Sequence, residues 1–166
     1  MRQVASLMLT AVVCCTFSGM ALAQVGQGVA TADERVKKLL DELELKYEID
    51  SDKDFKLVFE VGEAGRSQVV WIRSRTETYR NLEIREIMSP GYAAVDGELP
   101  HDVALKLLAD NRAKKMGAWQ KDGKYGVFVA HVAAQLDAEG LKSALLFTVE
   151  AADEMEQQLT GDRDEF

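Results

Sequence analysis

The most regular hydrophobic pattern of this chain is the alternation in residues 55–61 (FKLVFEV), where Phe55, Leu57, Phe59 and Val61 occupy every second position. A period of two is typical of a half-buried β-strand, because successive side chains point to opposite faces. The same pattern predicts strands over 68–75 and 82–88. The short loops between these three strands favour an antiparallel meander. A shorter alternation predicts one further short strand over 46–49.

Apolar spacings of three and four residues predict three helices. The first runs to about Leu43, with Thr31 and Glu34 as a capping box at its start. The second follows Pro100 and runs to about Met116, where Gly117 is expected to end it in the left-handed conformation. Its predicted apolar face comprises Val103, Leu107, Leu108 and Asn111.

The last predicted helix begins after Asp137, which is expected to cap it. Between the second and third helices, residues 118–120 and 124–130 are expected to form a hairpin with a type I′ turn at Asp122-Gly123. Ser89-Pro90-Gly91 is expected to end the strand over 82–88. The predicted order is α-β-β-β-α-β-β-α, which indicates an α+β fold with helices packed on one face of an antiparallel sheet.

The first 23 residues have the layout of a secretory signal peptide: Arg2, an apolar run, and the small residues Ala21 and Ala23 before Gln24. We expect cleavage before Gln24 and a periplasmic location in a Gram-negative host. Two alternatives are open. The apolar run is short for a membrane anchor, which needs about 20 residues. Cys14 and Cys15 would allow lipidation, but Val13 is larger than the residue that lipoprotein processing prefers.

We expect a flexible leader over 24–30, a single domain over 31–160 and an acidic tail over 161–166. Removing residues 1–23 from the 166-residue chain leaves 143 residues, no cysteine, and 19 Lys and Arg against 28 Asp and Glu. A domain of this size without disulfides must depend on one hydrophobic core. The resulting net charge of −9 disfavours nucleic acid and anionic membranes as partners, and favours a basic one.

The element order, the motif Leu107-Leu108-x-x-Asn111, the motif Gly117-x-Trp119 and the alternating aromatic strand resemble the YbjN family of bacterial proteins. That family is labelled as regulators of sensory transduction. The resemblance spans about residues 33–159 and implies a fold like that of type III secretion chaperones, often paired as a homodimer. It implies no catalytic residues. An exported protein cannot escort effectors in the cytoplasm, so the resemblance to chaperones concerns shape.

We expect neither a metal nor a cofactor. Residues 50–54 (DSDKD) begin like a calcium-binding loop, but Phe55 and Val61 stand where an EF-hand needs Gly and Glu. The two histidines, His101 and His131, are far apart in sequence. Catalytic residues are not expected either, since Gly65-Arg66-Ser67 lacks the G-x-S-x-G nucleophile elbow.

The strand over 69–75 carries the candidate site. Trp71, Arg73 and Arg75 project to one face, and we group Arg85 of the next strand with them as an interface. Trp and Arg are enriched at interface hot spots. The alternative interpretation is a solvated sheet face, with Arg side chains lying over Trp71 and beside cross-strand Glu residues. Two further polar or aromatic residues, Asn111 and Trp119, are expected to be structural.

These observations favour an exported, non-enzymatic protein-interaction domain whose partner is another protein or a second copy. The alternative is a small-molecule-binding or sensory module, with its pocket between the second helix and the loop over 90–99. A third hypothesis, a hydrolase without a known motif, stays open.

Overall fold

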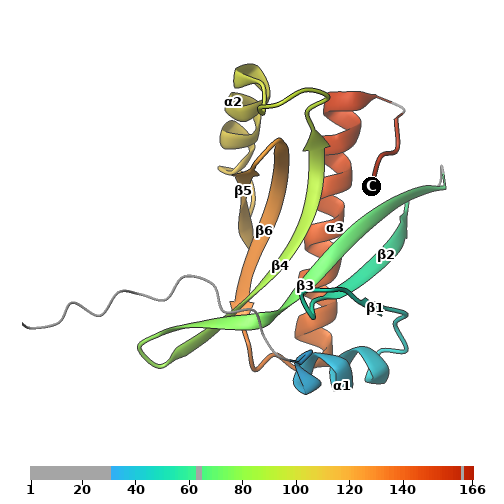
Figure 1. Ribbon diagram of the computed structural model, residues 1–166, viewed down its shortest axis with the longest axis vertical. Helices are drawn as coiled ribbons and strands as arrows, with labels where there is room; N and C mark the ends of the chain where they lie inside the picture. Colours follow the sequence, from blue (N-terminus) through green and yellow to red (C-terminus); the bar gives the residue numbers. More distant parts are fainter. Residues whose placement is uncertain (1–30, 63–64, 162) are drawn as a thin grey trace, which may run out of the picture.

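The computed structural model describes residues 31–62, 65–161 and 163–166, so the predicted signal peptide, its cleavage site and the leader lie outside the described residues. The described chain forms one sheet and three helices (Figure 1). In chain order the elements are α1 (Glu34–Glu42), β1 (Glu48–Ile49), β2 (Phe55–Val61), β3 (Arg66–Tyr79), β4 (Leu82–Ala93), α2 (His101–Asp110), β5 (Gly117–Asp122), β6 (Tyr125–Ala133) and α3 (Ala138–Thr160).

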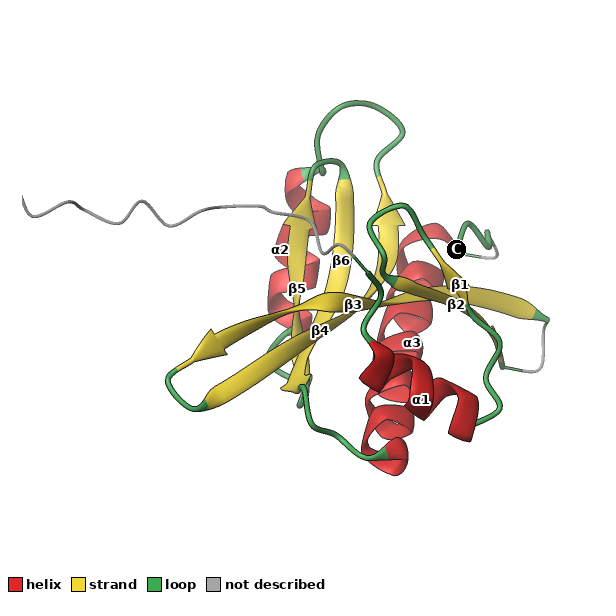
Figure 2. Cartoon of the chain, turned by 60° about the horizontal axis from the view of Figure 1, so that its bottom comes forward, coloured by secondary structure: helices red, strands yellow, loops and turns green. Residues whose placement is uncertain are grey.

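The sheet has the strand order β1-β2-β3-β4-β6-β5, and all neighbouring strands are antiparallel. The long helix α3 crosses β3, β4 and β6, and α2 lies beside β5 (Figures 1 and 2). All three helices contribute to the same buried cluster as the sheet, so they cover one face of it. The predicted α+β class is therefore confirmed.

The core lies between this face and the helices. Its largest fully buried apolar side chains come from every layer, namely Leu40, Phe55, Ile72, Ile87, Phe128, Leu145 and Met155. These strand residues alternate with side chains on the opposite face, which we call the open face. The open face carries Trp71 and Arg73 of β3, Met88 of β4 and Val127 of β6. Within the described ranges, no helix is long and apolar enough to cross a membrane.

Helix α1 begins at a different residue from the predicted one. The N-cap is Asp33, whose carboxylate accepts a hydrogen bond from the backbone N–H of Arg35 at 2.8 Å. The predicted capping box of Thr31 and Glu34 is wrong, because Glu34 is the first helical residue and not the third. At the other end of the chain, the predicted cap is confirmed: Asp137 accepts from the N–H of Gly140 at 2.8 Å.

Strand β4 does not end at Ser89-Pro90-Gly91 as predicted. It continues to Ala93, and the register with β6 shifts between Pro90 and Tyr92. This irregularity accommodates a proline in an inner strand, where its missing N–H would otherwise break the ladder. Gly91 also makes room for Trp119, since a Cβ there would lie 2.5 Å from the indole ring.

Helix α2 ends at Asp110, earlier than predicted, and Gly117 is the first residue of β5 instead of a helix cap. A Cβ at Gly117 would lie 2.3 Å from the backbone oxygen of Val129 on β6. The backbones of β5 and β6 therefore approach each other too closely at this position for any residue with a side chain. Leu108, predicted to be on the apolar face, is 66 % exposed, whereas Val103 and Leu107 are buried as expected.

The β5–β6 hairpin was predicted one residue too early. Asp122 pairs with Tyr125, so the two central turn residues are Gly123 and Lys124. Gly123 has φ +57 and Lys124 is not among the residues with positive φ. Glycine with positive φ at the first central position indicates a type II′ turn in place of the predicted type I′.

Candidate binding site

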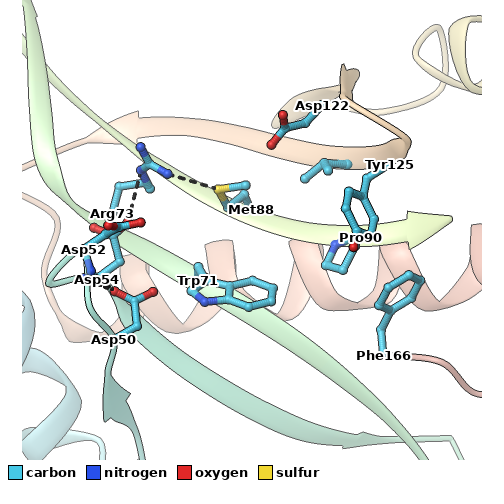
Figure 3. Close-up of a pocket in the computed structure, with 11 residues that line it drawn as sticks. Asp50, Asp52, Asp54, Trp71, Arg73, Met88, Pro90, Asp122, Tyr125 and Phe166 are labelled. Atoms are coloured by element: carbon cyan, nitrogen blue, oxygen red, sulfur yellow. Dashed lines mark hydrogen bonds and ion pairs between the residues drawn. The ribbon is translucent and has the colours of Figure 1, made fainter. Parts of the chain in front are cut away.

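A groove of about 410 Å³ lies on the open face, and we call it the open-face groove (Figure 3). Four parts of the chain form it: the turn before β2, the central strands β3, β4 and β6, the β5–β6 hairpin and the C-terminal residue Phe166. In Figure 3 the indole of Trp71 occupies the middle. Arg73 and the acidic turn lie on one side of it, and Pro90, Tyr125 and Phe166 lie on the other.

The period of strand β3 positions Trp71 and Arg73. They are two residues apart and therefore share the open face, with Ile72 buried between them on the helical side. Trp71 is directly opposite Met88 of β4, and the Sδ atom of Met88 lies 4.0 Å from the Nη1 atom of Arg73. The three side chains form the floor of the groove.

Arg73 is held by the buried carboxylate of Asp54. Its Nε atom lies 3.2 Å from Oδ2 of Asp54, but the two atoms do not form a hydrogen bond because their geometry is unsuitable. The other carboxylate oxygen of Asp54 accepts the backbone N–H of Ser74 at 2.7 Å. Burial raises the pKa of Asp54, and these two neighbours oppose that shift. Arg73 is thus anchored at one end of the groove by an electrostatic contact.

The acidic turn that leads into β2 is a structural turn, as predicted. Oδ1 of Asp50 accepts the backbone N–H groups of Asp52 and Asp54 at 2.9 and 3.0 Å. Asp52 itself points to the groove, as does Asp122 from the β5–β6 hairpin. In the described parts of the chain, neither of these two carboxylates lies within ion-pair distance of a basic side chain. The groove therefore contains negative charge that is not compensated locally.

The acidic tail is not an isolated extension, because residues 163–166 fold back onto the sheet. The carboxylate of Asp164 accepts the N–H of Ser67 at 3.2 Å, and the N–H of Glu165 donates to Glu156 at 2.6 Å. Glu156 is fully buried, which raises its pKa, and it also lies 3.1 Å from Arg66. These contacts bring the side chain of Phe166 to the groove.

The structure brings together two of the four predicted interface residues. Trp71 and Arg73 line the open-face groove, whereas Arg75 lies outside it, in an adjacent hollow that Arg73 also lines. Arg75 is 2.7 Å from Glu77 of its own strand, in a solvent-exposed ion pair. This contact agrees with a solvated face at that end of β3.

The grouping of Arg85 with the others is wrong. Arg85 shares the helical face with Ile87, its side chain is only 3 % exposed, and it lies 2.6 Å from Asp33. It also donates to the backbone oxygens of Arg73 and Ser74. Asp33 neutralises the guanidinium of Arg85, and the two backbone oxygens accept its hydrogen bonds. Arg85 is therefore part of the core and does not face a partner.

The two residues predicted to be structural are confirmed as such. Trp119 is 7 % exposed and stacks edge-on against Phe128, with ring centroids 5.4 Å apart. Asn111 accepts the N–H of Trp119 at 2.6 Å, so it fastens the end of α2 to β5.

Of the groove residues, the sequence analysis predicts only Trp71 and Arg73 as site residues, and it misses Asp122, Tyr125 and Phe166 among the others. The available signal in the sequence is the position of Tyr125, an aromatic residue that directly follows a predicted turn. The pocket expected between α2 and the loop over 90–99 does not coincide with the groove, to which α2 contributes no residue. Among the described residues, no group of three or more His, Cys, Asp or Glu could hold a metal ion. No protein-family model matches the chain, and no curated protein matches it either.

Proposed function

We propose that this chain is an exported, non-enzymatic protein-interaction domain that binds its partner through the open-face groove. The observation that supports this is the position of Trp71 and Arg73 in a groove on the sheet face opposite the three described helices. A hollow on a sheet face with Trp, Tyr and Arg in it has the composition of an interface hot spot.

Two properties of the sequence support the biological context. The signal-peptide pattern of residues 1–23 favours export to the periplasm. The resemblance to the YbjN family, whose fold is similar to that of type III secretion chaperones, favours a binding role over catalysis. A second copy of the chain is one of the partners that this proposal allows.

Crosslinking in cells tests the proposal. The exported protein is crosslinked in the envelope, purified and analysed by mass spectrometry beside the double variant Trp71→Ala/Arg73→Ala. We expect a specific crosslinked partner, or a crosslinked homodimer, that is lost in the variant. Trp71→Leu is made in parallel, because Arg73 contacts Asp54 and its removal could loosen the turn.

The matched control is Tyr79→Ala/Leu82→Ala. These two side chains are 62 % and 55 % exposed and pair at the tip of the β3–β4 hairpin, which projects from the rest of the sheet in Figure 2. Neither of them lines the groove. The control should retain the crosslinked species. A partner that persists in all groove variants, or that depends only on the hairpin tip, would contradict binding at the groove.

A second candidate function is the binding of a small molecule. The volume of the groove, about 410 Å³, lies within the range of about 300–1,000 Å³ that is common for ligand pockets. A ligand that binds only the native state of a protein raises the melting temperature of that protein. A thermal-shift screen in which hits lose their effect in Trp71→Leu would favour this function.

A further inference from the structure

Resting on the proposed function, we infer that the open-face groove recognises a basic segment of a partner protein, in which a Lys or Arg side chain is flanked by apolar residues. The chemistry of the groove walls, and not the identity of any partner, supports this assignment.

The first argument is the charge of the groove. Within the described ranges, its lining contains four Asp side chains and one basic side chain, Arg73. Arg73 is paired with Asp54. Asp50 accepts hydrogen bonds from backbone N–H groups, which are neutral and therefore do not cancel its negative charge. Asp52 comes from the turn before β2 and Asp122 from the β5–β6 hairpin, so two separate elements bring carboxylates to the groove. Lys124 is the basic residue next to this region, and it lies over the ring of Tyr125.

The second argument is the aromatic wall. The aromatic ring of Tyr125 lines one rim, where the ammonium of the neighbouring Lys124 is 5.5 Å from the ring centroid, within the distance of a cation–π contact. The indole of Trp71 is the better acceptor for such a contact. The aliphatic stem of a Lys or Arg would lie against Met88 and Pro90 while its charged head reaches the carboxylates.

The third argument is the complementarity of the whole molecule. The chain carries a net charge of −8 at pH 7, so its field attracts basic partners at long range and repels acidic ones. An acidic segment could pair with Arg73 and Arg75, but Arg75 is paired with Glu77, and the neighbouring carboxylates would oppose its approach.

Peptide titration followed by NMR tests the inference. The probes are acetyl-Leu-Lys-Leu-Arg-Leu-amide and its counterpart with Glu in place of both basic residues. The chain has two Trp, so its spectrum contains two indole N–H signals, and Trp71→Phe assigns them. We expect the basic peptide to shift the signal of Trp71 and leave that of buried Trp119 in place. Binding should weaken as salt is raised, because the Coulomb attraction is screened.

The charge-neutralising variant Asp52→Asn/Asp122→Asn should weaken the basic peptide at least tenfold. The control Glu42→Gln/Glu150→Gln removes the same charge from exposed positions outside the groove, and should change the affinity less than twofold. Equal binding of the acidic and basic peptides, or equal effects of the two double variants, would overturn the inference.

The outcomes separate the two proposals. A crosslinked partner that depends on Trp71, together with a preference for the acidic peptide, overturns only the basic specificity. Crosslinking that is independent of Trp71 overturns the proposed function itself. If n-butylguanidine saturates the Trp71 signal as tightly as the peptide does, a free small cation is the ligand and the peptide assignment is overturned.

Discussion

At the scale of single residues, Asn111 connects the end of helix α2 to strand β5. Its side-chain oxygen accepts the N–H of Trp119, and its amide nitrogen lies 3.5 Å from the carbonyl oxygen of the same residue. The indole N–H of Trp119 donates in turn to Asp110 at 2.8 Å. These hydrogen bonds satisfy the backbone N–H and the indole N–H of Trp119 near the start of β5, where the indole ring is buried.

Asn111→Ala is expected to lower the free energy of unfolding by about 1–2 kcal/mol, because the N–H of Trp119 would lose its acceptor. Urea denaturation measures this. Asn111→Asp keeps the acceptor oxygen but loses the amide donor that faces the carbonyl oxygen of Trp119, so it should recover only part of the stability lost in Asn111→Ala. Equal losses in both variants would show that the side-chain oxygen is not the stabilising contact.

Arg85 depends on a carboxylate from a distant part of the sequence. Asp33 accepts from Arg85 at 2.6 Å and from Arg35 at 2.7 Å, and Arg35 also binds Glu83 at 2.8 Å. Burial raises the pKa of Asp33, but the hydrogen bonds from Arg35 and Arg85 outweigh burial and hold the pKa well below its ordinary value. The hydrogen bond from Arg35 lowers the pKa of Glu83 to about 2.

Asp33→Asn is expected to destabilise the protein by about 3 kcal/mol at pH 7, because it leaves Arg85 buried without its counter-ion. Asn still caps α1, so the loss reports the charge. The pKa of Asp33 in the folded state lies below its ordinary value of 3.8. The stabilisation by the ionised carboxylate is therefore fully present above about pH 4 and is lost as the pH falls toward the folded-state pKa. The difference between wild type and variant should therefore shrink below about pH 4.

Urea unfolding at a series of pH values checks this. The control is Asp41→Asn, which breaks the exposed pair with Lys37 and should leave stability nearly unchanged. A constant difference between wild type and Asp33→Asn down to the lowest pH would contradict the role of the ionised carboxylate.

At the scale of elements, the close contact between β5 and β6 decides where α2 must stop. Residues 111–116 continue the helical composition, but β5 has to pair with β6 from Gly117 onward. Gly117 is opposite Ala130, and the absence of a side chain lets its backbone approach Val129. The pairing of the two strands therefore overrides the local helical pattern.

Gly117→Ala is expected to lower the free energy of unfolding by about 2 kcal/mol, since backbone of β6 would have to move to admit the Cβ. Gly140→Ala in α3 is the contrast. Its Cβ would meet the end of the Leu136 side chain at 2.9 Å and the carboxylate of Asp137 at 3.0 Å. Both are side-chain ends that can shift, and Ala favours a helix, so the change should stay below about 1 kcal/mol. Chemical denaturation of both variants measures the difference, and similar values would contradict the steric explanation.

At the scale of the whole molecule, the C-terminal segment connects α3, the start of β3 and the open-face groove. Arg66, the first residue of β3, contacts both α3 and the C-terminal segment. Its Nε atom lies 2.7 Å from Asp153 of α3, and its Nη1 atom donates to the backbone oxygen of Arg163 at 3.0 Å. The segment thus forms part of the wall of the candidate site through Phe166.

Asp164→Ala is expected to detach this segment from the start of β3, because it removes the acceptor of the Ser67 N–H. Hydrogen exchange followed by mass spectrometry should show faster exchange at Ser67, with the central part of β4 unchanged. Glu165→Ala is the matched control, since Glu165 bonds to Glu156 through its backbone N–H. Unchanged exchange at Ser67 in Asp164→Ala would contradict the proposed attachment.

The periodicity of the sequence was enough to predict the strands, the three helices and the α+β class. It also predicted that Trp71 and Arg73 share a face, because side-chain alternation follows from the covalent geometry of each strand. The same parity placed Arg85 beside Ile87, which was a signal for its burial. Arginine is usually exposed, and Arg85 departs from this rule because Asp33 pairs with it in the core.

The sequence by itself determined which segments become strands or helices and which side chains accompany each other along a strand. Only the tertiary structure decided that Asp33 neutralises Arg85, that Gly117 belongs to a strand, and that Phe166 lines the same groove as Trp71. Local patterns depend on neighbours a few residues apart, whereas these contacts join residues separated by long stretches of chain or require two backbones to approach. Such pairings exist only once the sheet has assembled.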